Sequence, residues 1–143
     1  MPMHVDMVAV PHGLTSSPCL LVLVPVSAGY PSPADDYFEG PLDLHQHLIT
    51  HPTATFFVRV AGESMREAGI HSGDVLVVDR ALTPRDGSVI IAVVHGELTV
   101  KRLSIRHGQL MLMPENSQYA PLPITEATAF EVWGVVTYVI HRL

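Results

Sequence analysis

The sequence predicts a mainly β fold, antiparallel, with few short helices and an extended N-terminal arm. From residue 55 onward, short runs rich in valine, isoleucine and phenylalanine alternate with turns that contain glycine, a pattern typical of antiparallel sheets. Only one short segment has helical spacing of its apolar residues. The first 40 residues are rich in proline and carry no sustained periodicity, which indicates an arm.

The length and composition indicate one modest domain. The chain has 143 residues, of which 48% are apolar and 15% charged, so it can bury a core but has no room for two independent ones. We expect the arm to cover residues 1–40 and a β-rich core to cover residues 41–143.

The order of the expected elements follows from local patterns. Apolar spacing and an acidic first residue predict a helix over 43–49, which ends before Pro52. His95-Gly96 and Arg85-Asp86-Gly87 are expected turns. The expected strands are 55–61, 74–79, 88–94, 97–103, 110–113 and 130–140.

Several protein classes are excluded by composition. The single cysteine, Cys19, cannot form an internal disulfide or a cysteine zinc cluster. A net charge of −6 without a basic run leaves no surface for direct, sequence-specific DNA binding.

The apolar run Cys19–Val26 bears on membrane insertion and export. It is interrupted by Pro25 and is far shorter than the roughly 18 residues that span a bilayer. Small residues follow it, as at a signal-peptide cleavage site, but no lysine or arginine precedes Arg59, whereas a signal peptide needs a positive start. We therefore expect a cytoplasmic protein without a membrane anchor.

Lys101 is the only lysine in the chain and lies inside an expected apolar strand. A desolvated lysine can lose its proton and act as a general base, whereas a guanidinium stays charged. The alternative is an edge-strand lysine whose stem covers the core while its amine reaches water.

Ser64 lies where an expected strand gives way to the helix-like segment Met65–Ala68. A serine at such a junction can be a nucleophile, because nearby backbone N–H groups can bind a developing oxyanion. The alternative is a serine that caps the helix N-terminus. The segment lacks the second glycine of a lipase-type elbow.

Three of the nine histidines, His45, His47 and His51, cluster in the sequence. On a helix the first two point to different faces, and no carboxylate spacing completes a zinc site. We expect solvated side chains here, and neither a metal nor a cofactor.

Taken together, these motifs resemble the LexA/UmuD family of self-cleaving serine–lysine peptidases. Serine and lysine in this order and at this spacing are much more specific than either motif alone. The resemblance also implies the antiparallel β fold that LexA shares with signal peptidases. It rests on Gly62-Glu63-Ser64-Met65, Gly73-Asp74, Asp79, Gly96, Thr99-Val100-Lys101-Arg102-Leu103, Trp133-Gly134-Val135-Val136, Pro31–Tyr37 and Asp43-Leu44.

The resemblance assigns roles to particular residues. It implies that Ser64 is the nucleophile, that Lys101 is the general base, and that the N–H groups of Glu63 and Ser64 form the oxyanion hole. Members of the family cut themselves upstream of the serine, and the matching bond here is Ala28-Gly29.

The resemblance also implies partners. Repressors of the family carry a DNA-binding helical domain, and the proline-rich residues 1–28 fit none, so we expect a UmuD-type member. Such a protein acts in the SOS response and in translesion synthesis. It forms a homodimer, its cleavage is prompted by a RecA–single-stranded DNA filament, and the cleaved form serves a Y-family DNA polymerase of the UmuC type.

Two other functions remain open at this point. One is a catalytically idle module that only binds a polymerase. The other is a signal-peptidase-like protease, which shares the serine–lysine chemistry but needs a membrane anchor that we do not expect in this chain.

Overall fold

The computed structural model describes residues 2–9, 19–22 and 38–143. The chain divides into two units. The larger one comprises Met1–Pro11 and His51–Leu143, and the smaller one His12–Thr50. In the part of the chain that is described, no helix is long and apolar enough to cross a membrane.

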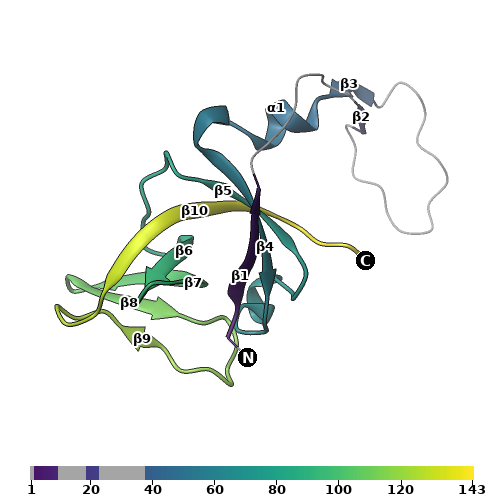
Figure 1. Cartoon of the computed structure of the whole chain (residues 1–143). Helices are drawn as coiled ribbons and strands as arrows, with labels where there is room; N and C mark the ends of the chain where they lie inside the picture. The colour runs from purple at the N-terminus through teal and green to yellow at the C-terminus, as the bar shows by residue number, and fades with distance from the viewer. Residues whose placement is uncertain (1, 10–18, 23–37) are drawn as a thin grey trace. The chain divides into compact units, whose positions relative to one another are not determined.

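The larger unit is built on one antiparallel sheet (Figure 1). Its strand order is β1-β4-β5-β10-β6-β7-β8-β9. The long strand β10 pairs with β5 through its second half and with β6 through its first half. The strands are β1 (His4–Ala9), β4 (Thr55–Ala61), β5 (Val75–Asp79), β6 (Val89–Val94), β7 (Glu97–Arg106), β8 (Gln109–Met113), β9 (Leu122–Pro123) and β10 (Phe130–Ile140).

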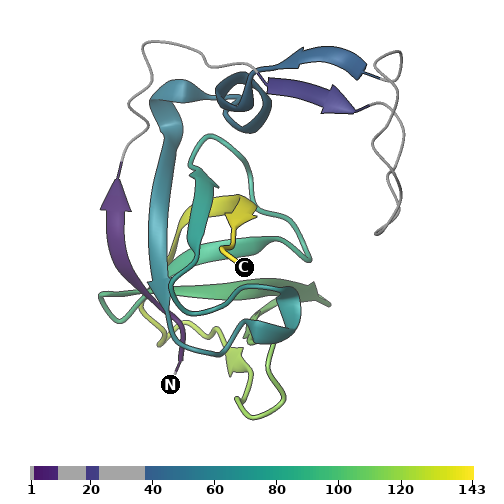
Figure 2. The ribbon, with the colours of Figure 1, turned by 90° about the vertical axis from the view of Figure 1, so that its right-hand side faces the viewer.

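The first strand closes this sheet into a ring. β1 pairs along β4, and Figures 1 and 2 show the two strands side by side. At its other side, His4 pairs with Thr99 of β7. β1 thereby covers the free edge of β4 and meets the edge of β7 at Thr99, which removes edges open to pairing with another chain. The predicted antiparallel β fold is confirmed.

Buried side chains lie on both faces of β6. Ile91 packs in one cluster with Val60, Leu76 and Val100, whereas its neighbour Ile90 packs in a second cluster. Successive side chains of a strand point to opposite faces, so a strand that is buried on both faces reads as a continuous apolar run. This explains why 89–94 carries no polar alternation.

The turns and remaining short helices agree with local chemistry. β6 and β7 are joined at His95 and Gly96, which both have positive φ, as the twist of a two-residue hairpin requires. Two 3-10 helices, η2 (Pro52–Ala54) and η3 (Arg66–Ala68), flank β4.

The smaller unit contains β2 (Cys19–Val22), β3 (Phe38–Leu42) and α1 (Leu44–Leu48). β2 and β3 pair antiparallel. The side chain of Asp43 caps α1 by accepting hydrogen bonds from the backbone N–H groups of His45 and Gln46, which satisfies donors that a helix start leaves unpaired.

The division into units differs from the one predicted at residue 40. His4–Ala9, expected within the arm, is a strand of the large sheet, and α1, expected within the core, belongs to the smaller unit. The predicted cleavage bond Ala28-Gly29 lies outside the described residues.

Candidate active site

Ser64 lies in the turn between β4 and η3. Gly62, with φ of 110°, redirects the chain after β4 in a conformation that favours glycine. The N-cap of η3 is Met65, and no side chain makes a capping hydrogen bond to this helix. The Ser64 hydroxyl accepts from Met3 N and Lys101 Nζ instead, in contrast to the capping role that its position in the sequence left open.

Lys101 reaches this hydroxyl from β7, which flanks β1 on the side opposite β4. It pairs with Ile90 of β6, and on the other side of β7 the strand β1 pairs at Thr99 and β8 pairs from Arg102 onward. Its Nζ donates a hydrogen bond of 3.1 Å to Ser64 Oγ. Lys101 is thus not an edge-strand lysine with its amine in water, and the structure joins the two residues that the sequence singled out.

The environment of Lys101 favours its neutral form. Burial lowers the pKa of the Lys101 amine below the usual value for lysine, because desolvation penalises the ammonium. Ser64 itself is fully buried. A neutral amine beside a buried hydroxyl is the arrangement in which lysine can accept the serine proton.

The backbone around Ser64 is fixed by a loop that is distant in the sequence. Asn116 Nδ2 donates a hydrogen bond of 2.8 Å to the carbonyl oxygen of Glu63. The N–H of Glu115 donates to the carbonyl oxygen of Ser64 at 2.7 Å. Two consecutive carbonyls are thereby held. Because the Glu63 carbonyl and the Ser64 N–H belong to the same peptide plane, this sets the direction of the Ser64 N–H. That the N–H groups of Glu63 and Ser64 form an oxyanion hole remains a prediction.

We expect Asn116→Ala to slow any reaction at Ser64 by at least about tenfold, because small displacements of reacting groups cost this much or more. It also removes one of two hydrogen bonds to the Glu63 carbonyl oxygen, which still accepts one from the Arg66 N–H at 3.2 Å, so we expect a loss of about 0.5–1.5 kcal/mol of unfolding free energy. Rates and thermal unfolding of Asn116→Ala and of the neighbouring Ser117→Ala measure both effects. Equal rates in the two variants would contradict a positioning role for Asn116.

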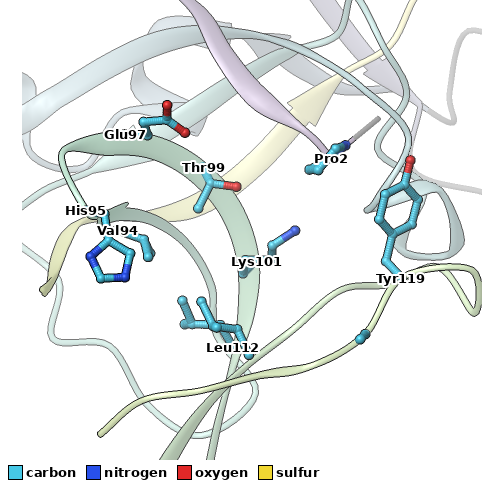
Figure 3. Close-up of a pocket in the computed structure, with 10 residues that line it drawn as sticks. Pro2, Val94, His95, Glu97, Thr99, Lys101, Leu112 and Tyr119 are labelled. Atoms are coloured by element: carbon cyan, nitrogen blue, oxygen red, sulfur yellow. The ribbon is translucent and has the colours of Figure 1, made fainter. Parts of the chain in front are cut away.

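A pocket of about 320 Å³ adjoins the Lys101 amine. Figure 3 shows Pro2 and Tyr119 on the side toward which this amine points. Thr99 and Leu112 also line the pocket. The space beside Lys101 is therefore large enough for side chains of a peptide segment.

The histidines take separate places. His45 and His47 lie in α1, whereas His51 Nδ1 is 2.6 Å from Asp79 Oδ2. Within residues 2–9, 19–22 and 38–143, no three His, Cys, Asp or Glu side chains gather so as to hold a metal ion.

The amino-acid sequence matches a known protein family. The family model described as Peptidase S24-like matches residues 21–137. The chain belongs to this family. The match covers β4, η3 and β7 and thus includes both Ser64 and Lys101.

Individual relatives support the same assignment. The chain is 48% identical to protein MucA of Salmonella typhimurium over 79% of this chain and 77% of MucA. It is 49% identical to protein SamA of Salmonella typhimurium over 80% and 79% of the two chains, and 46% identical to protein ImpA of Escherichia coli over 80% and 78%. The predicted membership of the LexA/UmuD family, as a UmuD-type protein, is confirmed.

A repressor is more distant. The LexA repressor of Acidithiobacillus ferrooxidans is 40% identical over 78% of this chain but only 55% of the repressor. This difference in coverage agrees with the UmuD-type assignment.

Two residues at the site, Asn116 and Met3, were not predicted from the sequence. Asn116 and Met3 both contact the segment that holds the nucleophile, yet each is more than 50 positions from it. No local pattern marks either residue, because each contact forms only when distant parts of the chain come together in the fold.

Proposed function

We propose that this UmuD-type protein of the SOS response cuts its own chain between Ala28 and Gly29. Ser64 acts as the nucleophile and Lys101 as the general base. The processed form, Gly29–Leu143, then serves as an accessory subunit of a Y-family DNA polymerase in translesion synthesis. Support comes from the family, a peptidase family, and from the similarity to MucA, SamA and ImpA over about four fifths of the chain.

The observation that carries the peptidase proposal is the contact between Lys101 Nζ and Ser64 Oγ at 3.1 Å. A serine hydroxyl is a weak nucleophile unless an adjacent base removes its proton. A lysine performs this role only when it is neutral, and burial shifts the pKa of Lys101 in that direction. Serine–lysine pairs are a known variant of the serine–base arrangement.

The reaction has two stages. Neutral Lys101 takes the Ser64 proton while Oγ attacks the carbonyl carbon of Ala28, and the N–H groups of Glu63 and Ser64 stabilise the oxyanion. As the C–N bond breaks, the Lys101 ammonium gives its proton to the departing Gly29 amine. Water, deprotonated by Lys101, then attacks the Ser64 ester. The Lys101 ammonium returns its proton to the departing Ser64 Oγ, and the carboxylate of Ala28 is released.

The partners follow from the family resemblance. We propose a homodimer whose cleavage is stimulated by a RecA–single-stranded DNA filament. Because the cut segment is tethered to a dimer, it is present at high effective concentration whether it enters its own site or that of the second copy.

Incubation with RecA, an ATP analogue and single-stranded DNA tests the SOS proposal. We expect a fragment that begins at Gly29 to form faster than in protein alone, with none in Ser64→Ala. Full-length protein in every condition would instead leave a polymerase-binding module without peptidase activity. Cutting of added foreign preproteins would favour the signal-peptidase-like alternative.

Gly29 offers a test of the cleavage position. We expect Gly29→Val to slow cleavage by at least about 100-fold, because a branched side chain beside the scissile carbonyl hinders a narrow cleft and displaces the reacting atoms. Gly13→Val, farther from the bond, is the matched control. Fragment yield is measured by intact mass, and equal yields from both variants would move the cleavage site elsewhere.

A further inference from the structure

The start of the chain lies on the nucleophile. The backbone N–H of Met3 donates a hydrogen bond of 2.8 Å to Ser64 Oγ. On the other side of the same residue, Thr99 Oγ1 donates to the Met3 carbonyl oxygen, also at 2.8 Å. The Met3 side chain is fully buried in the cluster around Val60, and Ser64 has no exposed surface. No other peptide can therefore reach Ser64 while Met3 is in place.

Strand pairing holds this segment in position. Residues of β1 pair with β4 from His4 opposite Ala61 to Ala9 opposite Phe57, and His4 also pairs with Thr99 of β7. These are the backbone groups that would pair with any other extended segment that approached Ser64 between β4 and β7. Two strands cannot use them at the same time.

Gly62 allows Pro2 and Met3 to pack closely against the turn before Ser64. A Cβ at this position would lie 2.4 Å from the carbonyl oxygen of Pro2 and 2.6 Å from the Cα of Met3. Such distances exclude any side chain at Gly62 unless Pro2 and Met3 move away. Because Gly62 has no side chain, Pro2 and Met3 can lie directly against the turn that precedes Ser64.

The peptide bond between Pro2 and Met3 is not oriented for attack by Ser64. A nucleophile attacks a carbonyl carbon from above the plane of the amide. Here the amide between Pro2 and Met3 directs its N–H at Oγ, and an acceptor in that direction lies near the amide plane. The hydrogen bond also occupies an Oγ lone pair. The segment can therefore occupy the site without being cut.

We propose that Pro2–Ala9 is an internal inhibitor of the Ser64–Lys101 pair, which must leave the groove before the cleavage segment can enter. This inference rests on the proposed function, because it concerns regulation of the same site. The cleavage rate then equals the rate of the open form multiplied by the fraction of molecules in which β1 has left. The pocket beside Lys101, which Pro2 also lines, is available to the entering segment.

Two methionines of the segment Pro2–Ala9 give a matched pair of variants. Met3 is fully buried, whereas Met7 is 57% exposed. We expect Met3→Ala to raise the rate of Ser64-dependent self-cleavage at least tenfold, because the buried anchor of β1 is lost. Met7→Ala is expected to cleave at the rate of the parent. Rates are measured by intact mass at one alkaline pH, with circular dichroism to establish folding.

Competition distinguishes an inhibitor strand from general loosening of the ring. A synthetic peptide of residues 2–9 is expected to slow cleavage of Met3→Ala, whereas the same peptide with alanine at position 3 is not. If Met3→Ala does not fold, Thr99→Val takes its place. It removes the hydroxyl donor to Met3, and we expect its rate to rise about threefold or more.

The outcomes separate the two proposals. Ser64-dependent cleavage of the parent with no acceleration in a folded Met3→Ala, or in Thr99→Val where that variant is used, would overturn the inhibitor strand and leave the proposed function standing. Acceleration that neither peptide slows would also overturn it. Absence of Ser64-dependent cleavage in the parent and in all variants would overturn the proposed function and the inference together.

Discussion

Lys101→Arg is expected to abolish self-cleavage, with a loss of at least about 1,000-fold. Arginine has a side chain of similar reach and is a cation like the lysine ammonium, but its guanidinium does not lose a proton at any working pH. The variant can still donate a hydrogen bond toward Ser64 Oγ, so it removes the base and little else. First-order rates from intact mass over several days at fixed pH measure the effect.

Arg106→Lys is the matched control for this substitution. Arg106 ends the same strand and is exposed, so the exchange of one cation for the other there is expected to leave the rate unchanged. Cleavage of Lys101→Arg at a rate near that of the parent would exclude Lys101 as the base.

The rate of self-cleavage is expected to rise with pH. Only neutral Lys101 accepts the Ser64 proton, and below its pKa the neutral fraction increases about tenfold per pH unit. Burial lowers the pKa of Lys101, so the rise is expected to level off below about pH 10.4, the usual value for lysine. Below this plateau, the rate is therefore expected to rise about tenfold for each pH unit.

Substitutions can distinguish the effect of Lys101 on the pH dependence from that of the other titratable residues in its pocket. His95, Glu97 and Tyr119 line the same pocket. His95→Gln and Glu97→Gln are expected to keep the dependence of about tenfold per pH unit, and Tyr119→Phe is expected to keep the plateau. A rate that is flat from pH 6 to pH 10 in the parent would contradict a lysine base.

Most of the sheet was predictable because its strands carry local signals. Glycine-bearing turns bound the runs of β5, β6 and β7, and the positive φ of Gly96 is what the hairpin sequence predicts. The pair of Ser64 and Lys101 was predictable only through the family resemblance. Each residue alone has a more common structural role.

The strand β1 could not be predicted from its own residues. Its side chains are mostly exposed and only Val5 is half-buried, so the alternation that usually marks a strand is missing. Its conformation is set by β4 and by Thr99, which lie far along the chain. Asn116 is similar, because its value to the site depends on the carbonyl of Glu63.

Intact mass of the purified parent and of Ser64→Ala, after the same incubation at alkaline pH, tests whether Ser64 cuts this chain at Ala28-Gly29. We expect one pair of fragments, residues 1–28 and 29–143, in the parent and none in the variant. The same fragments from Ser64→Ala would exclude Ser64 as the nucleophile, and a cut at another bond in the parent would exclude Ala28-Gly29 as the cleavage site.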